Sequence, residues 1–421
     1  MFHSQLFTKT SKSSQSDASS VNADLLTRAG FIHKTMAGVY SYLPLGLVVL
    51  RKIENIIREE MNAIGGQEIL MSGLSPRDNW QKTNRWEGFD ALFRLPAAGD
   101  QEYALNPTHE ELVTPIAKEF VQSYKDLPFA CYQVQTKFRN ELRAKSGVLR
   151  GREFLMKDLY SFHTDQEDLD AFYQVAQGAY DAVFRRLGLA DRTYLTFASG
   201  GTFSKYSHEY QVLLPEGEDT IYISEEAEKQ GKRIAVNKEI FEKGKTECPV
   251  TGGKSFREEC ASEAANIFKL GTKFSEPFQL QYTDSQGKRF PVIMGCYGIG
   301  VSRLMGILAE AFADEHGLRW PSSAAPADVH VVPIAKTKDE EAYTKAVELY
   351  DALIDAGVTA IFDDRIQSSV GERLSNADLI GAPMRVVISP KTLKENCAEV
   401  KDRMSGAVKM VPMPEIISVL S

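Results

Sequence analysis

Residues 136–141 read Thr-Lys-Phe-Arg-Asn-Glu and end an apolar-rich run that begins at Ala130. A second such run, from Glu153 to Phe162, follows a basic segment that contains Gly147 and Gly151. The two runs predict strands joined as a long hairpin, with the glycines as flexible points of the connection. An arginine at the end of the first strand can project into a cleft, where its planar guanidinium grips phosphate or carboxylate.

A second arginine ends the stretch Gly298-Ile299-Gly300-Val301-Ser302-Arg303. Residues 289–294 predict a strand and residues 299–313 a helix, so Gly298 and Gly300 are expected at a strand-to-helix junction. The glycine pair also invites a dinucleotide-binding interpretation. That interpretation lacks a third glycine and an acidic residue about 20 positions further on. A phosphate-binding cleft containing both arginines is therefore the better prediction.

The composition predicts a soluble globular protein of two or three domains. The chain has 421 residues, of which 43% are hydrophobic and 25% charged, and this length exceeds one ordinary domain. No apolar run approaches the ~20 residues of a membrane helix, and residues 1–20 lack the apolar core of an export signal. We therefore expect a cytoplasmic protein without a membrane role.

Five scattered cysteines argue against a disulfide framework. Cys248 and Cys260 are the pair most similar to a metal knuckle, but zinc takes about four ligands and no second pair lies near them. We expect no metal site formed by protein ligands alone.

The net charge of −8 argues against general nucleic-acid binding. Between Lys137 and Lys157, however, seven basic residues stand against two acidic ones. Such a segment can meet both a nucleotide and an RNA end. A solvated basic loop is the alternative that charge alone leaves open.

Helical spacing of apolar residues begins after Pro44 and runs to Met61. Gly65-Gly66 ends this helix, and residues 68–71 predict a strand. A further helix is predicted at 168–187 and short strands at 211–214 and 220–224, followed by a charged, loosely patterned stretch to Glu263.

The linker-like segment Trp320 to Pro326 predicts a domain boundary. Beyond it, strands are expected at 329–334, 358–362 and 385–389. They alternate with helices at 339–356, at 371–380 and near Pro414, a pattern typical of a small α/β domain. We expect an α/β protein with domains at 1–322 and 327–421.

The two arginine stretches resemble motifs 2 and 3 of class II aminoacyl-tRNA synthetases, and their flanks, 136–163 and 294–297, resemble prolyl-tRNA synthetases of the bacterial kind. The helix after Pro44 corresponds to motif 1, which builds the dimer interface in this family. Asp363-Asp364-Arg365 and residues 377–381 resemble its anticodon-binding domain. The resemblance implies an α+β catalytic domain with an antiparallel sheet, a small α/β anticodon-binding domain, a homodimer and a tRNA partner.

Joining an amino acid to ATP requires fixed cations and positioning rather than a protein nucleophile. The resemblance implies that Arg139 and Arg303 are the catalytic residues and that Mg²⁺ accompanies ATP. A lone Phe-Arg-x-Glu is otherwise a structural ion pair, which is the competing interpretation. The ATP-binding residues implied by the resemblance are Arg139, Glu141, Arg150, Phe154, Gln211 and Arg303.

The segment 106–111 resembles the proline-binding loop of the family. Thr108 followed by Glu111 is also a capping box for a helix, and the two interpretations are compatible. A lone His or Cys is more often a packed core residue, and Arg143, which the resemblance places near the tRNA acceptor end, is equally well explained by a salt bridge. The proline-binding residues implied by the resemblance are Thr108, Glu110, Arg139, His208 and Cys296.

The interval from Gln211 to Asn266 is too short for the large editing insertion that bacterial members of the family usually carry. Because a missing methylene changes binding by only ~1–3 kcal/mol, alanine is expected to be rejected poorly. We expect no editing in cis. Two alternatives remain: a threonyl or histidyl enzyme of the same subclass, and a catalytically inactive relative that acts as a binding subunit.

Overall fold

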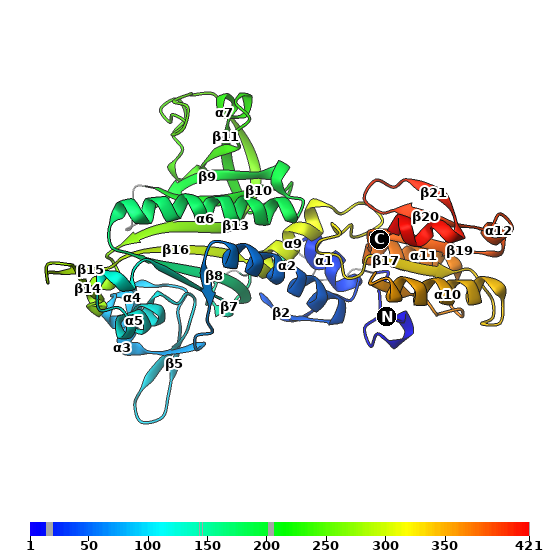
Figure 1. The fold of residues 1–421 in the computed structure, drawn as a ribbon, viewed down its shortest axis with the longest axis horizontal. Coiled ribbons are helices and arrows are strands. Elements are labelled where there is room, and N and C mark those ends of the chain that lie inside the picture. The colour runs from blue at the N-terminus through cyan, green and yellow to red at the C-terminus, as the bar shows by residue number, and fades with distance from the viewer. Residues whose placement is uncertain (14–19, 143, 145, 201–205, 421) are drawn as a thin grey trace. The chain divides into compact units, whose positions relative to one another are not determined.

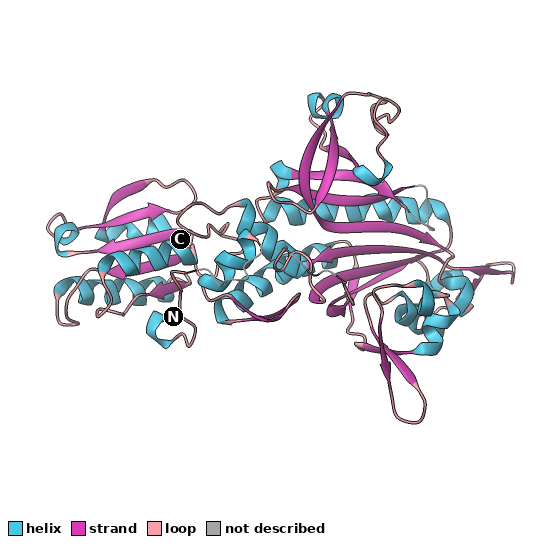
Figure 2. Ribbon diagram, turned by 180° about the vertical axis from the view of Figure 1, so that it is seen from behind, coloured by secondary structure: helices cyan, strands magenta, loops and turns pink. Residues whose placement is uncertain are grey.

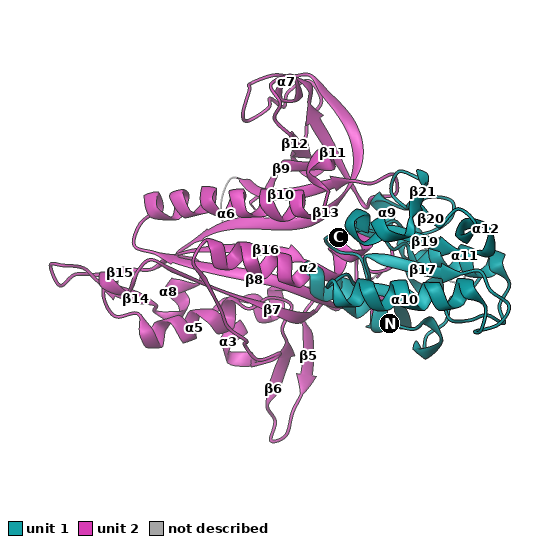
Figure 3. Ribbon diagram, turned by 45° about the vertical axis from the view of Figure 1, so that its right-hand side comes forward, with its two compact units in different colours: residues 1–35, 40–53, 308–421 teal, residues 36–39, 54–307 magenta. Residues whose placement is uncertain are grey.

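The computed structural model describes residues 1–13, 20–142, 144, 146–200 and 206–420. The chain forms two compact units (Figure 3), one made of residues 1–35, 40–53 and 308–421 and the other of residues 36–39 and 54–307. Across the described ranges, no helix has the length and apolar character needed to cross a membrane.

The larger unit is built on a nine-stranded sheet with the order β10-β9-β12-β11-β13-β16-β8-β7-β3 (Figures 1 and 2). Its pairings are antiparallel except for β3 with β7 and β9 with β12. The strands are β3 (Gly66–Glu68), β7 (Phe129–Phe138), β8 (Glu153–His163), β9 (Thr193–Ser199), β10 (Tyr206–Leu213), β11 (Asp219–Ser224), β12 (Ile234–Asn237), β13 (Phe256–Gly271) and β16 (Ile293–Gly300).

The predicted hairpin is confirmed as β7 and β8. The two strands pair antiparallel from Phe129 opposite Phe162 to Phe138 opposite Glu153, and the rings of Phe129 and Phe162 stack at 4.5 Å. Arg139 therefore follows directly on a fully paired strand, and its backbone N–H donates to the Arg152 carbonyl at 2.8 Å.

Helix α6 (Gln166–Arg186) covers one face of this sheet and contacts β8, β13 and β16 (Figure 1). Neighbouring strand residues point to opposite faces, and β8 shows both. Lys157 Nζ contacts Tyr180 of α6 at 2.6 Å, whereas Asp158 lines a cavity on the opposite face. The sheet thus separates a helix-covered face from the face that carries the cavity.

Strand β13 is the element that the sequence analysis missed. Its residues, Phe-Arg-Glu-Glu-Cys-Ala-Ser-Glu-Ala-Ala-Asn and onward, were expected to be irregular as far as Glu263. The strand nevertheless lies in the middle of the sheet, where it pairs with β10, β11 and β16. Pairing on both sides satisfies its backbone and overrides a weak local β preference.

A smaller layer of helices and a three-stranded sheet, order β4-β6-β5, completes this unit. The predicted capping box is wrong: α5 begins with His109 as N-cap and has no side-chain capping bond. The Thr108 hydroxyl donates to Glu110 instead. The remaining elements of the unit are β4 (Leu74–Pro76), α3 (Arg77–Lys82), α4 (Arg85–Gly88), β5 (Phe93–Pro96), β6 (Glu102–Leu105), α5 (Glu110–Phe120), η2 (Tyr124–Asp126), η3 (Ala190–Arg192), α7 (Glu225–Lys229), η4 (Lys238–Ile240), α8 (Ser275–Phe278), β14 (Gln281–Thr283) and β15 (Arg289–Pro291).

The strand-to-helix junction is confirmed at Gly300, the last residue of β16, where α9 (Val301–Ala311) begins at once. Gly298 lies inside β16 instead, paired with Asn266 and Asp158. Gly306 lets this helix approach the β7–β8 connection closely. A Cβ at this position would lie 2.7 Å from Val148 and 2.9 Å from Leu149. The same connection therefore packs directly against the helix that carries Arg303.

The smaller unit contains a five-stranded sheet, order β18-β17-β19-β20-β21. The first three strands are parallel, as the predicted alternation requires, and β20 and β21 add an antiparallel edge that was not predicted. The elements are η1 (His3–Gln5), α1 (Val21–Arg28), β17 (Val329–Pro333), α10 (Glu341–Asp355), β18 (Ala360–Phe362), α11 (Val370–Ile380), β19 (Met384–Ile388), α12 (Pro390–Leu393), β20 (Cys397–Asp402), β21 (Val408–Pro412), η5 (Met413–Glu415) and α13 (Ile416–Leu420).

The helix predicted after Pro44 is confirmed as α2 (Pro44–Ala63), which contributes residues to both units, as do β1 (Ile32–Met36) and α9. The strand expected at 68–71 begins earlier, as β3, and is only three residues long. β2 (Val39–Tyr42) pairs with β1.

Candidate active site

A cavity of about 340 Å³ opens on the sheet face opposite α6. Its walls come from the β7–β8 hairpin, from β13 and β16, and from the segments around α4 and α5. Eight residues predicted from the sequence line it: Thr108, Glu110, Arg139, Glu141, Arg150, Phe154, Cys296 and Arg303. The structure thus brings together two arginines that are 164 positions apart in the chain.

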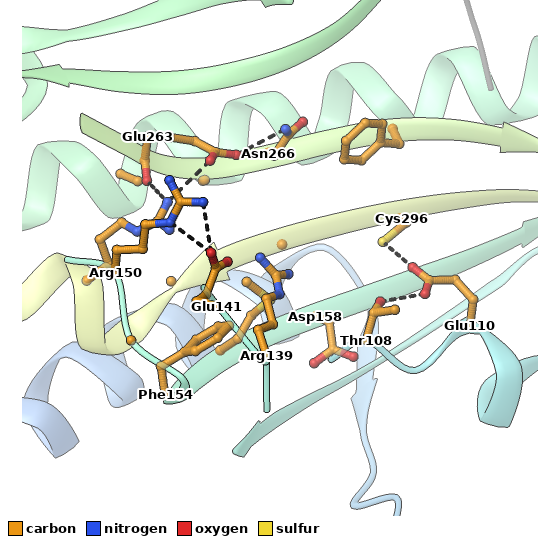
Figure 4. A pocket seen from close by; sticks show the side chains of 18 of the residues that line it. Thr108, Glu110, Arg139, Glu141, Arg150, Phe154, Asp158, Glu263, Asn266 and Cys296 are labelled. Atoms are coloured by element: carbon orange, nitrogen blue, oxygen red, sulfur yellow. Dashed lines mark hydrogen bonds and ion pairs between the residues drawn. The ribbon is translucent and has the colours of Figure 1, made fainter. Parts of the chain in front are cut away.

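Arg139 lies between two groups of polar residues in this cavity (Figure 4). Its guanidinium sits over the Phe154 ring, 5.2 Å from the ring centroid, and its Nε is buried without a hydrogen-bond partner. Burial, and then the nearby Arg303 guanidinium, lower the pKa of Arg139, although an arginine remains charged at neutral pH. A buried cation with an unpaired hydrogen-bond donor provides a preformed binding site for an anion.

The arginine end of the cavity, as we call it, consists of Glu141, Arg150, Glu263 and Arg303. Arg150 donates to Glu141 Oε2 at 2.9 and 3.2 Å. Arg303 donates from Nε to the Leu149 carbonyl at 2.7 Å and from Nη1 to Glu263 Oε2 at 3.3 Å. Both cations are paired with carboxylates on the cavity wall, and a phosphate can take the place of those carboxylates.

The acidic end of the cavity consists of Thr108, Glu110 and Cys296. Glu110 Oε2 accepts from the Thr108 hydroxyl, and its Oε1 accepts from the Cys296 thiol at 3.2 Å. Burial, and next the Glu110 charge, raise the pKa of Cys296 well above its usual value, so this thiol stays protonated and donates. The result is a buried carboxylate with both oxygens oriented.

A buried network lies under the acidic end. Lys137 Nζ contacts Asp158 Oδ1 and His109 Nδ1, each at 2.6 Å. Burial, and then the Lys137 charge, lower the pKa of His109 to about 4, so the ring is neutral and its Nε2–H donates to the Ser72 carbonyl at 3.1 Å. Its Nδ1 is then the acceptor for Lys137. This network fixes Asp158 on the cavity floor.

Two predicted residues, His208 and Gln211, do not line the cavity. The His208 Nδ1 lies 2.8 Å from the hydroxyl of Tyr173, a residue of α6 on the other sheet face. Gln211 is fully buried, and its amide donates to Glu209 and Asp219 at 2.8 and 3.0 Å. Arg143 lies outside the described residues.

Four further polar residues of the cavity were not predicted: Arg85, Asp158, Glu263 and Asn266. Glu263 and Asn266 belong to the unexpected strand β13. Asp158 carries a signal that was available, because a carboxylate inside the apolar run Glu153–Phe162 is unusual unless it is paired. Arg85 gave no such signal.

The groups of described His, Cys, Asp and Glu residues that could share a metal ion include neither Cys248 nor Cys260. The group found, His3, His330 and Asp363, lies in the other unit. Arg365 donates to both Asp363 oxygens at 3.0 and 2.7 Å, so that carboxylate already has a cationic partner.

The site has the parts needed for transfer between a small zwitterion and a polyphosphate. The acidic end provides a fixed anion for an ammonium group, the arginine end provides cations for phosphates, and Arg139 stands between them. Among the described lining residues there is no serine or lysine to act as nucleophile. Positioning and charge stabilisation are the catalytic means that this geometry offers.

Comparison with known families gives two matches. The family described as "tRNA synthetase class II core domain (G, H, P, S and T)" matches residues 93–312, and the one described as "Anticodon binding domain" matches residues 328–421.

Several named relatives extend over the whole chain. The proline–tRNA ligase of Anaplasma phagocytophilum is 37% identical over 429 residues, covering 99% of both chains. That of Geobacillus kaustophilus is 33% identical and covers 99% of this chain and 98% of its own, but the alignment runs over 562 residues. The Geobacillus protein therefore contains a segment that this 421-residue chain lacks.

Solved structures share the fold at low sequence identity. The Giardia lamblia prolyl-tRNA synthetase in complex with prolyl-adenylate has a TM-score of 0.75 and 21% identity, over 93% of this chain and 74% of that one. The Cryptosporidium parvum enzyme complexed with halofuginone and AMPPNP has a TM-score of 0.77 and 18% identity, over 95% and 75%.

Proposed function

The chain belongs to the class II aminoacyl-tRNA synthetases and, within them, to the proline–tRNA ligases, and on this premise we propose that its cavity binds L-proline at the acidic end and ATP at the arginine end. Proline and ATP give prolyl-adenylate and pyrophosphate, and proline then passes to the 3′ end of its tRNA. This assignment of the acidic and arginine ends depends on one observation: Arg139, whose Nε has no hydrogen-bond partner, lies between the two ends in one cavity.

The first step requires a proline carboxylate oxygen to attack the α-phosphorus while the bond to pyrophosphate breaks. Arg139 bridges the two negative reactants, which lowers their repulsion and holds them in line. Arg303 grips the outer phosphates, exchanging its bond to Glu263 for bonds to the leaving group. No protein atom forms a covalent bond in this step.

We place the adenine of ATP beside the β7–β8 hairpin. Phe154 offers a ring face for stacking, Glu141 accepts from the adenine amino group, and Arg150 is held by Glu141 close to both. Gln211 and His208 remain predictions as binding residues, because neither lines the cavity.

The proline end needs an anion for the secondary ammonium and an apolar slot for the ring. Glu110, oriented by Thr108 and Cys296, supplies the anion. Phe268, Leu270 and Phe274 line the same cavity and supply apolar walls.

Mg²⁺ prefers oxygen ligands, and β13 provides them next to the outer phosphates. Asn266 Oδ1 is buried without a hydrogen-bond partner, and Glu263 is bonded to Arg303 at the same wall. These two residues fit the ion, which neutralises charge on the phosphates when bound.

For tRNA we propose that Arg143 contacts the acceptor end and that domain 327–421 binds the anticodon, with domain 1–322 catalytic. For assembly we propose a homodimer through α2 and β3. β3 is an edge strand of the nine-stranded sheet, and Leu70 just after it is 77% exposed. We place the enzyme in the cytoplasm.

We also propose that the enzyme does not edit in cis, because the interval between β10 and β13 is short. Purified protein should leave Ala-tRNA intact over the time in which it charges proline. Rapid hydrolysis of Ala-tRNA by the pure enzyme would refute this.

The deciding experiment is amino-acid-dependent exchange of pyrophosphate into ATP across a panel of amino acids. We expect exchange with proline, weaker exchange with alanine, and none with threonine or histidine. Exchange with threonine or histidine would favour another enzyme of the subclass, and exchange with no amino acid would favour an inactive relative.

A further inference from the structure

Arg85, at the start of α4, is an unexpected member of the cavity wall. Its guanidinium lies among three aromatic rings, 5.3 Å from the centroid of Trp80, 4.9 Å from that of Phe89 and 5.5 Å from that of Phe274. Its side chain is only 17% exposed. Aromatic faces attract a cation and hold its plane, so this arginine is fixed before any ligand arrives.

Two consecutive carboxylates share this cation. Arg85 Nη1 donates to Glu111 Oε1 at 2.9 Å and Oε2 at 3.0 Å, and to Glu110 Oε2 at 3.5 Å. Glu111 also accepts from the Thr83 hydroxyl at 2.8 Å. Both carboxylates are buried at the first turn of α5, where an unpaired pair of like charges would drive proton uptake.

The two carboxylates differ in what else they face. Glu111 is fully buried, and burial is the main cause that raises its pKa to about 7. Glu110 lines the cavity, and so does Arg85. Arg85 therefore contacts both carboxylates: Glu110, which faces the cavity, and Glu111, which does not.

We propose that Arg85 is a positioning residue for proline: it gives the buried Glu110 carboxylate a cationic partner and directs it into the cavity, so that Glu110 can receive the secondary ammonium group. This inference rests on the proposed role of Glu110. It adds a residue that contacts neither the reacting atoms nor the phosphates.

A purely structural role is the competing explanation. In that case Arg85 only neutralises Glu111 and joins α4 to α5, and removing the Glu111 charge should make Arg85 dispensable. The double variant R85M/E111Q separates the two explanations, because it removes both the cation and the buried charge that a structural role would serve.

The test measures the KM for proline, the KM for ATP and kcat by pyrophosphate exchange, with a thermal melt of each variant. We expect R85M to raise the proline KM at least tenfold with an ATP KM changed less than twofold, and R85M/E111Q to retain that increase.

Three further variants keep the result interpretable. R77M is the matched control, since Arg77 also lies over an aromatic ring, Trp86 at 5.5 Å, but is absent from the cavity lining. R85K keeps the charge with a single nitrogen donor, and we expect an intermediate proline KM, including where R85M does not fold. E110Q tests the premise.

A double variant with the parent's proline KM overturns the inference. The inference is also overturned if E110Q raises the proline KM while R85M leaves it unchanged. If R85M does not fold, R85K takes its place in this comparison. An unchanged proline KM in E110Q would instead show that the assignment of Glu110 has failed.

Discussion

The two ends of the cavity handle charge differently. At the acidic end Glu110 is 7% exposed and its partner Arg85 17%. At the arginine end Arg150 and its partner Glu141 are 46% and 18% exposed, and Arg303 and its partner Glu263 are 24% and 32% exposed. A buried pair holds one geometry because breaking it leaves a charge without solvent. A solvated pair contributes ~0–1 kcal/mol and exchanges easily. The acidic end is therefore prearranged, whereas the cations at the arginine end can exchange their carboxylates for phosphates.

The strongest challenge to this division is R139A, because Arg139 serves both ends. We expect pyrophosphate exchange to fall about 10³-fold, in line with the loss of one fixed charge-stabilising donor, with an unchanged melting temperature. Exchange within tenfold of the parent would mean that the two ends do not depend on this residue.

The buried end is tested by E110Q. A hydrogen bond to a charged group contributes about 1.5–3 kcal/mol, and 1.4 kcal/mol is tenfold in affinity, so we expect the proline KM to rise about tenfold to a hundredfold. The ATP KM should change less than twofold. A comparable rise in both constants would show that the ends are not independent.

A third region extends the comparison to buried groups that are neutral at pH 7. Burial lowers the pKa of His330 to about 3 and that of His3 to about 4, and both ring nitrogens of His330 lack partners. In the unfolded chain these two imidazoles bind protons that the buried, neutral rings of the folded chain do not bind. Stability is therefore complete above about pH 6.5 and falls as the pH drops toward 4.

Between pH 7 and pH 5 we expect each of these histidines to lower the free energy of unfolding by about 2 kcal/mol, measured by urea denaturation. H330L should reduce this loss, whereas H316L, at an exposed position, should leave it unchanged. An identical pH dependence in H330L and the parent would contradict the assignment.

The smallest effect is expected at the solvated end. R150M removes a half-exposed cation bonded to Glu141, so we expect the ATP KM to rise less than tenfold and the effect to shrink at higher salt. A loss as large as that in E110Q would remove the contrast between the ends.

Much of this molecule could be predicted from the sequence because its patterns are local. The β7–β8 hairpin and the helices α2, α6, α10 and α11 follow from periodicity, and the meeting of Arg139 with Arg303 follows from resemblance. Strand β13 could not be predicted this way, because its charged and Ala-rich residues form a strand only between partners on both sides. Glu263 and Asn266 were missed with it.

His208 and Gln211 are absent from the cavity lining. His208 contacts Tyr173 of α6, and Gln211, which lies opposite Glu263 across a register shift, donates to Glu209 and Asp219. Nothing in the sequence marks these partners. Arg85 was missed because its role comes from Trp80, Phe89 and Phe274 rather than from its own neighbours in the chain.

The packing of the β7–β8 connection on α9 has a consequence for the order of events. The Leu149 carbonyl oxygen accepts a hydrogen bond from Arg303, and Gly306 leaves room for the Leu149 side chain against α9. We expect a triphosphate that draws this guanidinium away to break the hydrogen bond, so that the connection gains freedom as the nucleotide binds. A single carbonyl oxygen would then couple this connection to nucleotide binding.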